Sequence, residues 1–313
     1  MTLDSPVHRR PLRLGTRGSQ LARWQAEWVA GELRRLGHAV ELIEIATRGD
    51  VERSAAIEEI GTRGVFTKEI QRALLAGDVD LGVHSLKDLP TEPVNGLTLA
   101  AVPSRESAAD VLVTKLTATL DSLPRRARVG TGSLRRQSQL RHVRPDLQTE
   151  DVRGNVDTRI RKLDEGQFDA IVLAEAGLRR LDLGKRITQI LPFDVMLPAV
   201  GQGALAIECR SDDDQTLSAV APLEDAATRA AVTAERALLA HLRGGCMAPV
   251  GGWGRIENGV LRLSAVVLSI DGATRLAVDD SSPPDEANLL GERLAAELIG
   301  QGADKLIAMA RNA

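Results

Sequence analysis

Apolar positions along the chain recur at two different periods, and the change between them predicts where helices give way to strands. Over residues 20–36 they recur every three or four positions, as on one face of an amphipathic helix, and Ser19 stands where an N-cap is expected. Short apolar runs, such as residues 79–84 and 169–174, predict strands instead. Helices and strands therefore alternate from the start of the chain.

This alternation continues to about residue 210. The predicted strands cover residues 12–16, 40–46, 79–84, 110–114, 128–130, 147–152, 169–174 and 203–209, and the predicted helices cover residues 20–36, 67–76, 133–143 and 156–165. Such a βαβ rhythm predicts an α/β fold with mostly parallel sheets and ligand sites beyond the carboxyl ends of the strands. We expect the strand at 203–209 to return the chain to the first sheet.

The last third of the chain has a different pattern. Asp225 is in place to cap a long Ala-rich helix that ends near residue 242. Asn258-Gly259 and Asp271-Gly272 each separate apolar stretches, which is a strong hairpin signal, and a final helix is predicted over residues 286–299. These elements predict a small α+β domain. We therefore expect three domains: residues 1–103 with 204–221, residues 104–203, and residues 222–313.

Charge and composition exclude several classes of protein. The 40 Lys and Arg residues against 43 Asp and Glu give a net charge of −3, whereas a nucleic-acid-binding protein needs a concentrated basic surface. Three Phe, three Trp and no Tyr argue against base-stacking platforms. No stretch approaches the ~18 apolar residues that would span a bilayer. We expect neither a nucleic-acid nor a membrane partner.

Cysteine use and the N-terminal composition bear on the compartment. The two cysteines, Cys209 and Cys246, make neither a disulfide framework nor a zinc site, and the five histidines show no metal-ligand spacing. No metal is expected. The first 19 residues contain no apolar segment of the kind that directs secretion. The sequence therefore favours a cytoplasmic protein.

Arginine dominates the basic residues, because only six of the 40 are lysines. Codon bias alone would explain this total, since composition carries no information about a site. The alternative is that several arginines bind carboxylates bidentately, which lysine does less well. Both explanations stay open at the level of composition.

Four polar residues follow a predicted strand in the segment VHSLKDLP: His84, Ser85, Lys87 and Asp88. The carboxyl end of a parallel strand is where an active site would be built. A polar loop with a helix cap would give the same pattern, since such loops are common.

The segment RVGTGSLRRQSQL predicts a strand, a Gly-rich turn and a helix. Backbone N–H groups at such a helix N-terminus favour an anion, whereas the helix dipole disfavours the cations Arg135 and Arg136 in the first turn. An anionic ligand would offset that cost; a solvated basic face is the alternative. The turn lacks the ending of a Walker motif, and it is not GxGxxG.

Other arginines repeat this placement. Arg153 and Arg159 flank a turn and a helix in DVRGNVDTRI, and Arg17 follows the first strand. Together with Arg135 and Arg136 they lie near the carboxyl ends of strands in two predicted sheets. This clustering predicts a cleft for a ligand with several carboxylates or phosphates.

Cys246 lies in RGGCMAPVGG, a Gly-rich loop after the long helix. Glycines beside it allow close approach by a ligand, so that it could be a nucleophile or an attachment thiol. A small buried apolar side chain is the alternative.

Eight segments in order resemble the hydroxymethylbilane synthase (porphobilinogen deaminase) family. They are GTRGSQLARWQA, TRGDV, HSLKDLP, GTGSLRRQ, RGNVDTR, LAEAGLRRL, LPAVGQGALAIECR and GGCMAPVG, from about residue 12 to 251 and, more loosely, to the C-terminus. Each motif is weak alone, but eight in register are specific.

The resemblance implies a fold and a reaction. Two domains would resemble periplasmic anion-binding proteins, with the active site between them, and a third, small α+β domain would carry the cysteine loop. A dipyrromethane cofactor would be thioether-linked to Cys246. Four porphobilinogen units would be added with loss of ammonia, and hydrolysis would release hydroxymethylbilane. Each pyrrole carries an acetate and a propionate, which arginine forks are suited to bind. The family further implies a monomer.

The resemblance also implies roles for individual residues. Asp88 matches the carboxylate that stabilises positive charge on two adjacent rings, and Lys87 lies beside it in the catalytic site. The implied substrate-binding positions are Arg17, Ser19, Phe66, His84, Ser85, Arg153, Arg159, Arg180 and Gln202. The implied cofactor-binding positions are Cys246, Thr131, Ser133, Arg135 and Arg136.

Three positions depart from the family pattern: Gly132 where serine is common, Arg63 before Phe66, and Met247 after the cysteine. Residues 48–64 are long, charged and Gly-bounded, which predicts a mobile lid. Two other hypotheses remain open. A two-domain anion binder without catalysis is disfavoured by the third domain and the Gly-Gly-Cys loop. A phosphate-ligand enzyme is disfavoured by the lack of a Walker lysine or a metal site.

Overall fold

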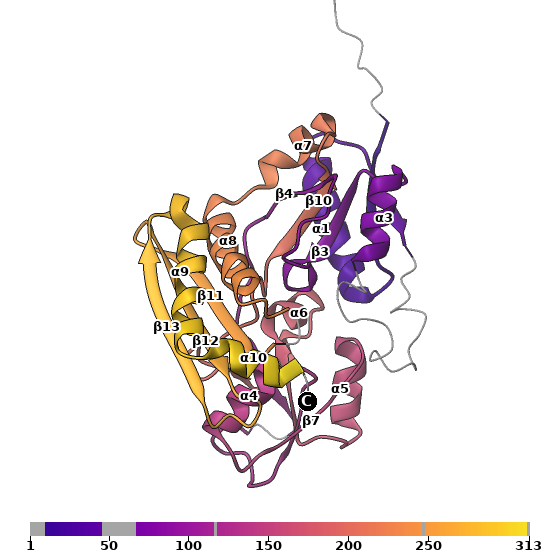
Figure 1. Cartoon of the computed structure of the whole chain (residues 1–313). Coiled ribbons are helices and arrows are strands. Elements are labelled where there is room, and N and C mark those ends of the chain that lie inside the picture. Colours follow the sequence, from indigo (N-terminus) through magenta and orange to yellow (C-terminus); the bar gives the residue numbers. More distant parts are fainter. Residues whose placement is uncertain (1–9, 46–66, 116–117, 246–247, 312–313) are drawn as a thin grey trace, which may run out of the picture. The chain divides into compact units, whose positions relative to one another are not determined.

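The computed structural model describes residues 10–45, 67–115, 118–245 and 248–311 (Figure 1). The chain divides into two compact units. The first comprises Met1–His84, Pro93–Ala101 and Ala206–Glu224, and the second Ser85–Glu92, Val102–Leu205 and Asp225–Ala313.

The first unit is built on a five-stranded sheet with the order β2-β1-β3-β10-β4. Its strands are β1 (Leu12–Thr16), β2 (Val40–Glu44), β3 (Leu81–Ser85), β4 (Leu97–Ala101) and β10 (Leu205–Arg210), and its helices are α1 (Gln20–Arg35), α3 (Lys68–Ala76) and α7 (Asp214–Val220). β1 is parallel to β2 and β3, whereas β10 is antiparallel to β4. Ser19 caps α1 by accepting the Ala22 N–H. The predicted return of the chain to this sheet, through β10, is confirmed.

The second unit contains another five-stranded sheet, with the order β7-β6-β8-β5-β9. Its strands are β5 (Asp110–Thr114), β6 (Arg128–Gly130), β7 (Gln148–Glu150), β8 (Ala170–Ala174) and β9 (Gln189–Ile190), and its helices are α4 (Leu134–Val143), α5 (Val156–Asp164) and α6 (Glu175–Arg180). β6 is parallel to β7 and β8, but β5 is antiparallel to β8 and β9. The sequence pattern did not predict this reversal.

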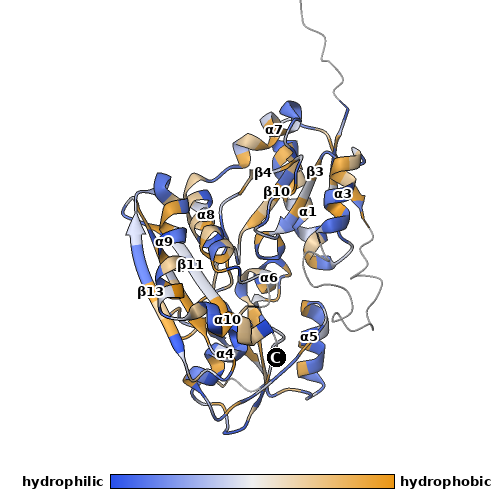
Figure 2. Ribbon diagram, viewed as in Figure 1, coloured by the Kyte–Doolittle hydropathy of each residue, from blue (hydrophilic) through white to orange (hydrophobic). Residues whose placement is uncertain are grey.

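The second unit also contains a three-stranded antiparallel sheet with helices packed on it. β11 (Val250–Glu257), β12 (Val260–Leu268) and β13 (Arg275–Ser282) form the sheet, and α8 (Ala226–His241), α9 (Ala287–Gly300) and α10 (Ala303–Arg311) contribute to a shared apolar core (Figure 1). Positive φ angles at Asn258 and Gly259 form the predicted β11–β12 hairpin. The end of β13 is hydrophilic (Figure 2), in keeping with an edge strand that faces solvent.

These elements confirm the predicted fold class of two α/β sheets and a small C-terminal α+β domain. The boundaries of the three domains at residues 103, 203 and 221 stay a prediction. Within the described residues, no helix has the length and apolar character needed to cross a membrane.

Candidate active site

A buried carboxylate, Asp110, lies at the centre of the candidate site. It is the first residue of β5, and none of its surface is exposed. Because β5 is antiparallel to β8, Asp110 lies opposite Ala174, the last residue of β8. Asp110 is therefore at the edge where the parallel strands β6 and β8 end, which is the functional edge of an α/β sheet.

Two arginines from the first turn of α4 share the Asp110 carboxylate. Arg135 donates from Nη1 to Oδ2 at 2.6 Å, and Arg136 donates from Nε and Nη2 to Oδ1 at 3.1 and 2.7 Å. Burial raises the pKa of Asp110, but the charges and hydrogen bonds of the two arginines outweigh it and hold that pKa well below its usual range. Asp110 is therefore ionised throughout the physiological pH range.

One carboxylate does not satisfy both arginines. Arg135 Nη1 also donates to the Leu197 carbonyl, and Arg136 Nη1 donates to that of Val172. Arg135 Nε, however, is buried without a hydrogen-bond partner among the described residues. A buried guanidinium with an unused donor favours a further anion at this place.

Lys87 joins this group through Gln202. Lys87 Nζ donates to Gln202 Oε1 at 3.4 Å, and Gln202 Nε2 donates to Asp110 Oδ1 and to the Ala108 carbonyl, both at 2.8 Å. Desolvation lowers the pKa of Lys87 to about 8, with the attraction of Asp88 opposing the shift. We call Asp110, Arg135, Arg136, Gln202 and Lys87 the Asp110 cluster.

Arg159 and Asp88 lie within electrostatic range of this cluster. Burial lowers the pKa of Arg159 to about 10, repulsion from Arg136 adds to the shift, and attraction from Asp88 opposes it. Asp88 itself is exposed, and Arg159 Nε donates to the Gly154 carbonyl at 2.8 Å. The structure thus brings Lys87 and Asp88 of the strand-end segment together with Arg135, Arg136 and Arg159.

The other predicted site residues of the second unit differ in their burial and hydrogen bonding. Arg180 is buried in α6 and donates to the Gly203 carbonyl at 2.7 Å, and burial lowers its pKa to about 10. Thr131 is buried, and its hydroxyl accepts the Ser133 N–H at 3.3 Å in the turn before α4. Arg153 is exposed. Their predicted roles in binding stay predictions.

The remaining described positions lie at or near the first sheet. Ser19 caps α1, Arg17 precedes it, and Ser85 ends β3. His84 is buried, with its Nε2 3.2 Å from Glu208 Oε2, and Gln71 Nε2 donates to Glu208 Oε1 at 3.0 Å. The structure does not place the Arg17, Ser19 and His84 side chains relative to the Asp110 cluster.

Several predictions fall outside the described residues. Phe66, Cys246, Arg63, Met247 and the proposed lid at 48–64 are among them. The described chain leads up to Cys246 through α8, Gly244 and Gly245, with Gly245 at a φ of 64°.

Two functional-site features escaped the sequence prediction. One is Asp110. The other is Glu235, a fully buried carboxylate in α8 that accepts from both Nη atoms of Arg105, at 2.5 and 3.2 Å, and from the N–H groups of Gly201 and Gly254. In the sequence, Glu235 could have been noticed as a single acidic residue on the largely apolar, Ala-rich face of the predicted helix that became α8.

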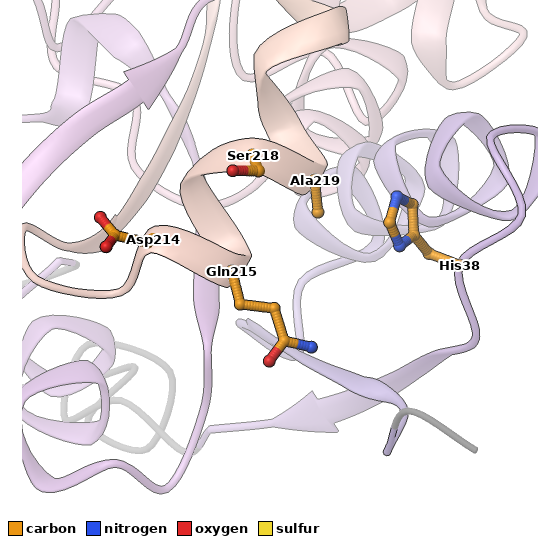
Figure 3. Close-up of a pocket in the computed structure, with 5 residues that line it drawn as sticks. All are labelled: His38, Asp214, Gln215, Ser218 and Ala219. Atoms are coloured by element: carbon orange, nitrogen blue, oxygen red, sulfur yellow. The ribbon is translucent and has the colours of Figure 1, made fainter. Parts of the chain in front are cut away.

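A pocket of about 510 Å³ lies elsewhere, in the first unit (Figure 3). His38 and four residues of α7 line it: Asp214, Gln215, Ser218 and Ala219. It contains none of the predicted site residues and no arginine. In the described part of the chain, no cluster of His, Cys, Asp and Glu could hold a metal ion.

Comparisons with known proteins match nearly the whole chain. A family model described as "Porphobilinogen deaminase, dipyromethane cofactor binding domain" matches residues 12–218, and "Porphobilinogen deaminase, C-terminal domain" matches residues 229–300. The porphobilinogen deaminase of Desulforudis audaxviator is 49% identical over 305 residues, covering 97% of this chain and 99% of that protein. That of Chlorobaculum tepidum is 47% identical over 307 residues, covering 96% and 98%.

Among solved structures, the methionine-binding protein MetQ is similar at 13% identity with a TM-score of 0.44. The match covers 68% of this chain and 89% of MetQ.

Proposed function

This chain belongs to the porphobilinogen deaminase family and is a hydroxymethylbilane synthase, and we propose that the Asp110 cluster binds the carboxylates of its pyrrole ligands. As a transferase of tetrapyrrole biosynthesis, it joins porphobilinogen units head to tail with release of ammonia. Hydrolysis then frees the product hydroxymethylbilane.

The observation that carries this proposal is the unbalanced positive charge of the cluster. A single ionised carboxylate, Asp110, faces the guanidinium groups of Arg135 and Arg136 and the ammonium of Lys87. Arg135 Nε is buried and unpartnered. Acetate and propionate groups on pyrrole rings supply the negative charge and the acceptor oxygens that these cations lack.

The same residues fit the dipyrromethane cofactor of this family. Arg135 and Arg136 would hold its carboxylates, with Thr131 and Ser133 in the turn before α4. We propose Cys246 as its thioether attachment point, since α8 and two glycines lead directly to this residue. When bound, the cofactor supplies the nucleophilic pyrrole carbon that the first substrate unit joins.

Asp88 is suited to stabilise positive charge on the substrate. The aminomethyl group of the substrate is an ammonium at neutral pH. When its carbon–nitrogen bond breaks, nitrogen keeps the electron pair and leaves as ammonia, and the positive charge passes to the pyrrole ring. Asp88 is an exposed carboxylate beside Lys87 and within electrostatic range of Arg159. A carboxylate that is already in position when the reaction starts stabilises this charge, because no groups have to reorient around it as the charge develops.

Lys87, Arg159 and Arg180 would bind substrate carboxylates. With a pKa of about 8, Lys87 is mostly an ammonium at neutral pH and can pair with an incoming acetate or propionate. Arg159 and Arg180 are partly or largely buried cations with the same capacity. The further substrate-binding residues that we propose are Arg17, Ser19, Phe66, His84, Ser85 and Arg153, whereas the buried Gln202 would act on the substrate through Lys87.

A turnover assay tests the proposal. Purified protein incubated with porphobilinogen should release ammonia and hydroxymethylbilane, and the Cys246→Ala variant should not. An inactive wild-type protein that carries its cofactor would contradict the proposal, as would full activity of the alanine variant.

We also propose that the enzyme is cytoplasmic and monomeric. The large exposed apolar side chains include Trp24 in α1, Leu36 at the end of α1, Leu75 in α3 and Leu289 in α9, so they come from three different helices. Light scattering tests the monomer, and cell fractionation tests the location. A dimer at micromolar concentration would contradict the first proposal.

A further inference from the structure

The amide of Gln202 can adopt one orientation between its two charged neighbours. Its oxygen faces the donor Lys87 Nζ, and its nitrogen faces the acceptor Asp110 Oδ1. A flipped amide would bring NH₂ against the ammonium and oxygen against the carboxylate, which loses both hydrogen bonds. The two charged groups therefore fix the orientation of the amide, and the amide connects Lys87 to Asp110.

The backbone of Gln202 is also held from several sides. Its carbonyl accepts from Arg105 Nε at 2.7 Å, its N–H donates to the Ala199 carbonyl at 2.9 Å, and the preceding Gly201 N–H donates to Glu235 at 2.6 Å. Gln202 has no exposed surface. The side chain is therefore a rigid connection rather than a flexible surface group.

We propose that Asp110 is a positioning residue that holds the Arg135–Arg136 pair directly and Lys87 through Gln202, so that these cations form one charged unit. This inference rests on the proposed function of the Asp110 cluster and deepens it. Asp110 touches no ligand directly, because its oxygens are taken up by Arg135, Arg136 and Gln202. Asp110 fixes the positions of these cations, and its negative charge favours the protonated form of Lys87.

The charges that face Lys87 determine the direction in which its pKa should change when Asp110 is replaced. Asp88 and Asp110 raise the pKa of Lys87, whereas Arg136 and Arg135 lower it, as does burial, which is the largest effect. Asp110→Asn removes one of the two stabilising charges and leaves both arginines in place. Gln202→Met has nearly the same length but has no amide oxygen to accept from Lys87 Nζ and no hydrogen bond to Asp110. Both variants should therefore lower the pKa of Lys87.

The titration of Lys87 can be measured directly in the holoenzyme. The chain has six lysines, so protein labelled with ¹³C at lysine Cε should give six resonances to follow against pH, and Lys87→Gln assigns one of them. We expect the midpoint to fall by about half a pH unit in both Asp110→Asn and Gln202→Met. Intact mass should also show lower cofactor occupancy in Asp110→Asn.

Asp80 provides a matched control. It is a buried aspartate of the first unit that pairs with three arginines, Arg10, Arg13 and Arg210. Asp80→Asn should lower stability and leave the Lys87 midpoint unchanged. An unchanged midpoint in both Asp110→Asn and Gln202→Met would overturn the inference, and if only one variant folds, its midpoint decides.

The outcome is separable from that of the proposed function. If Lys87→Gln turns over porphobilinogen as well as wild type, the proposed role of Lys87 fails. If Lys87→Gln is impaired but the midpoint does not respond to Asp110 or Gln202, the present inference alone fails.

Discussion

Two aspartates near Lys87 have opposite environments. Asp88 is exposed, whereas Asp110 is fully buried and shared by two guanidinium groups. An exposed carboxylate can face a ligand, while a buried one with all its oxygens paired can only organise its neighbours. This contrast supports the proposal that Asp88 stabilises charge on the substrate and that Asp110 positions its neighbours.

Replacing Asp88 by asparagine should lower kcat more than it raises KM. The carboxylate acts on a charge that develops during the reaction, so its loss should cost about a hundredfold or more in kcat. Asp88→Glu should retain part of the activity because the charge survives. Both constants are to be measured on folded, cofactor-loaded variants. A kcat for Asp88→Asn within a few-fold of wild type would move the catalytic role elsewhere.

The pH dependence of kcat/KM should reflect Lys87. Burial lowers its pKa to about 8, so the free enzyme loses this ammonium as pH rises through that value. If the ammonium binds a substrate carboxylate, kcat/KM should fall on the alkaline side of about pH 8. Lys87→Gln should have a lower kcat/KM without this decline. A wild-type profile that stays flat to pH 9.5 would rule out this role.

At the scale of elements, α4 carries in its first turn the arginines that we propose bind the cofactor, and further along it carries an arginine that binds other parts of the protein. Arg135 pairs with Asp110, whereas Arg141 donates to the Thr149 hydroxyl and the Ile270 carbonyl. The same helix thus offers two arginines to compare. Only the first is predicted to bind the cofactor.

Arg135→Leu should therefore give largely cofactor-free protein, whereas Arg141→Leu should keep the cofactor. The first change also leaves Asp110 with one guanidinium fewer, and breaking a buried ion pair costs about 3–5 kcal/mol. Intact mass measures cofactor occupancy, and urea unfolding measures stability. Equal, full occupancy in both variants would remove Arg135 from the binding role.

The pattern of apolar and polar residues was sufficient to predict most helices and strands, but it did not predict the direction of β5 in its sheet. Residues 110–114 were predicted as a strand, and Asp110 begins that strand in the structure. An aspartate before an apolar run looks the same whether the strand is parallel or antiparallel. Only the long-range pairing with β8 and β9 brings Asp110 to the edge where Arg135 and Arg136 begin α4. The arginines could be predicted from the sequence; their internal counter-ion could not.

At the scale of the whole molecule, α8 is connected to the Asp110 cluster through Glu235. This residue of α8 binds Arg105 and the Gly201 N–H, and Arg105 binds the Gln202 carbonyl. The helix that leads to Cys246 is therefore tied to the residues that hold Lys87. No local pattern could foresee contacts between segments so far apart in the sequence.

Glu235→Gln should destabilise the protein strongly. The side chain of Glu235 is fully buried and that of Arg105 nearly so, and the loss of one buried partner costs about 3–5 kcal/mol. Asp164→Asn is the control, because its pair with Arg186 is exposed and should contribute about 0–1 kcal/mol. Urea unfolding measures both changes. A loss below about 1 kcal/mol for Glu235→Gln would show that this pair does not tie the segments together.

The mass of the purified, active protein tests the central claim most directly. If the chain is a hydroxymethylbilane synthase with its cofactor on Cys246, its intact mass should exceed that of the sequence by two linked pyrrole units. Digestion should place this increment on the peptide that contains Cys246, and Cys246→Ala should lack it. An unmodified mass in protein that turns over porphobilinogen would contradict the account.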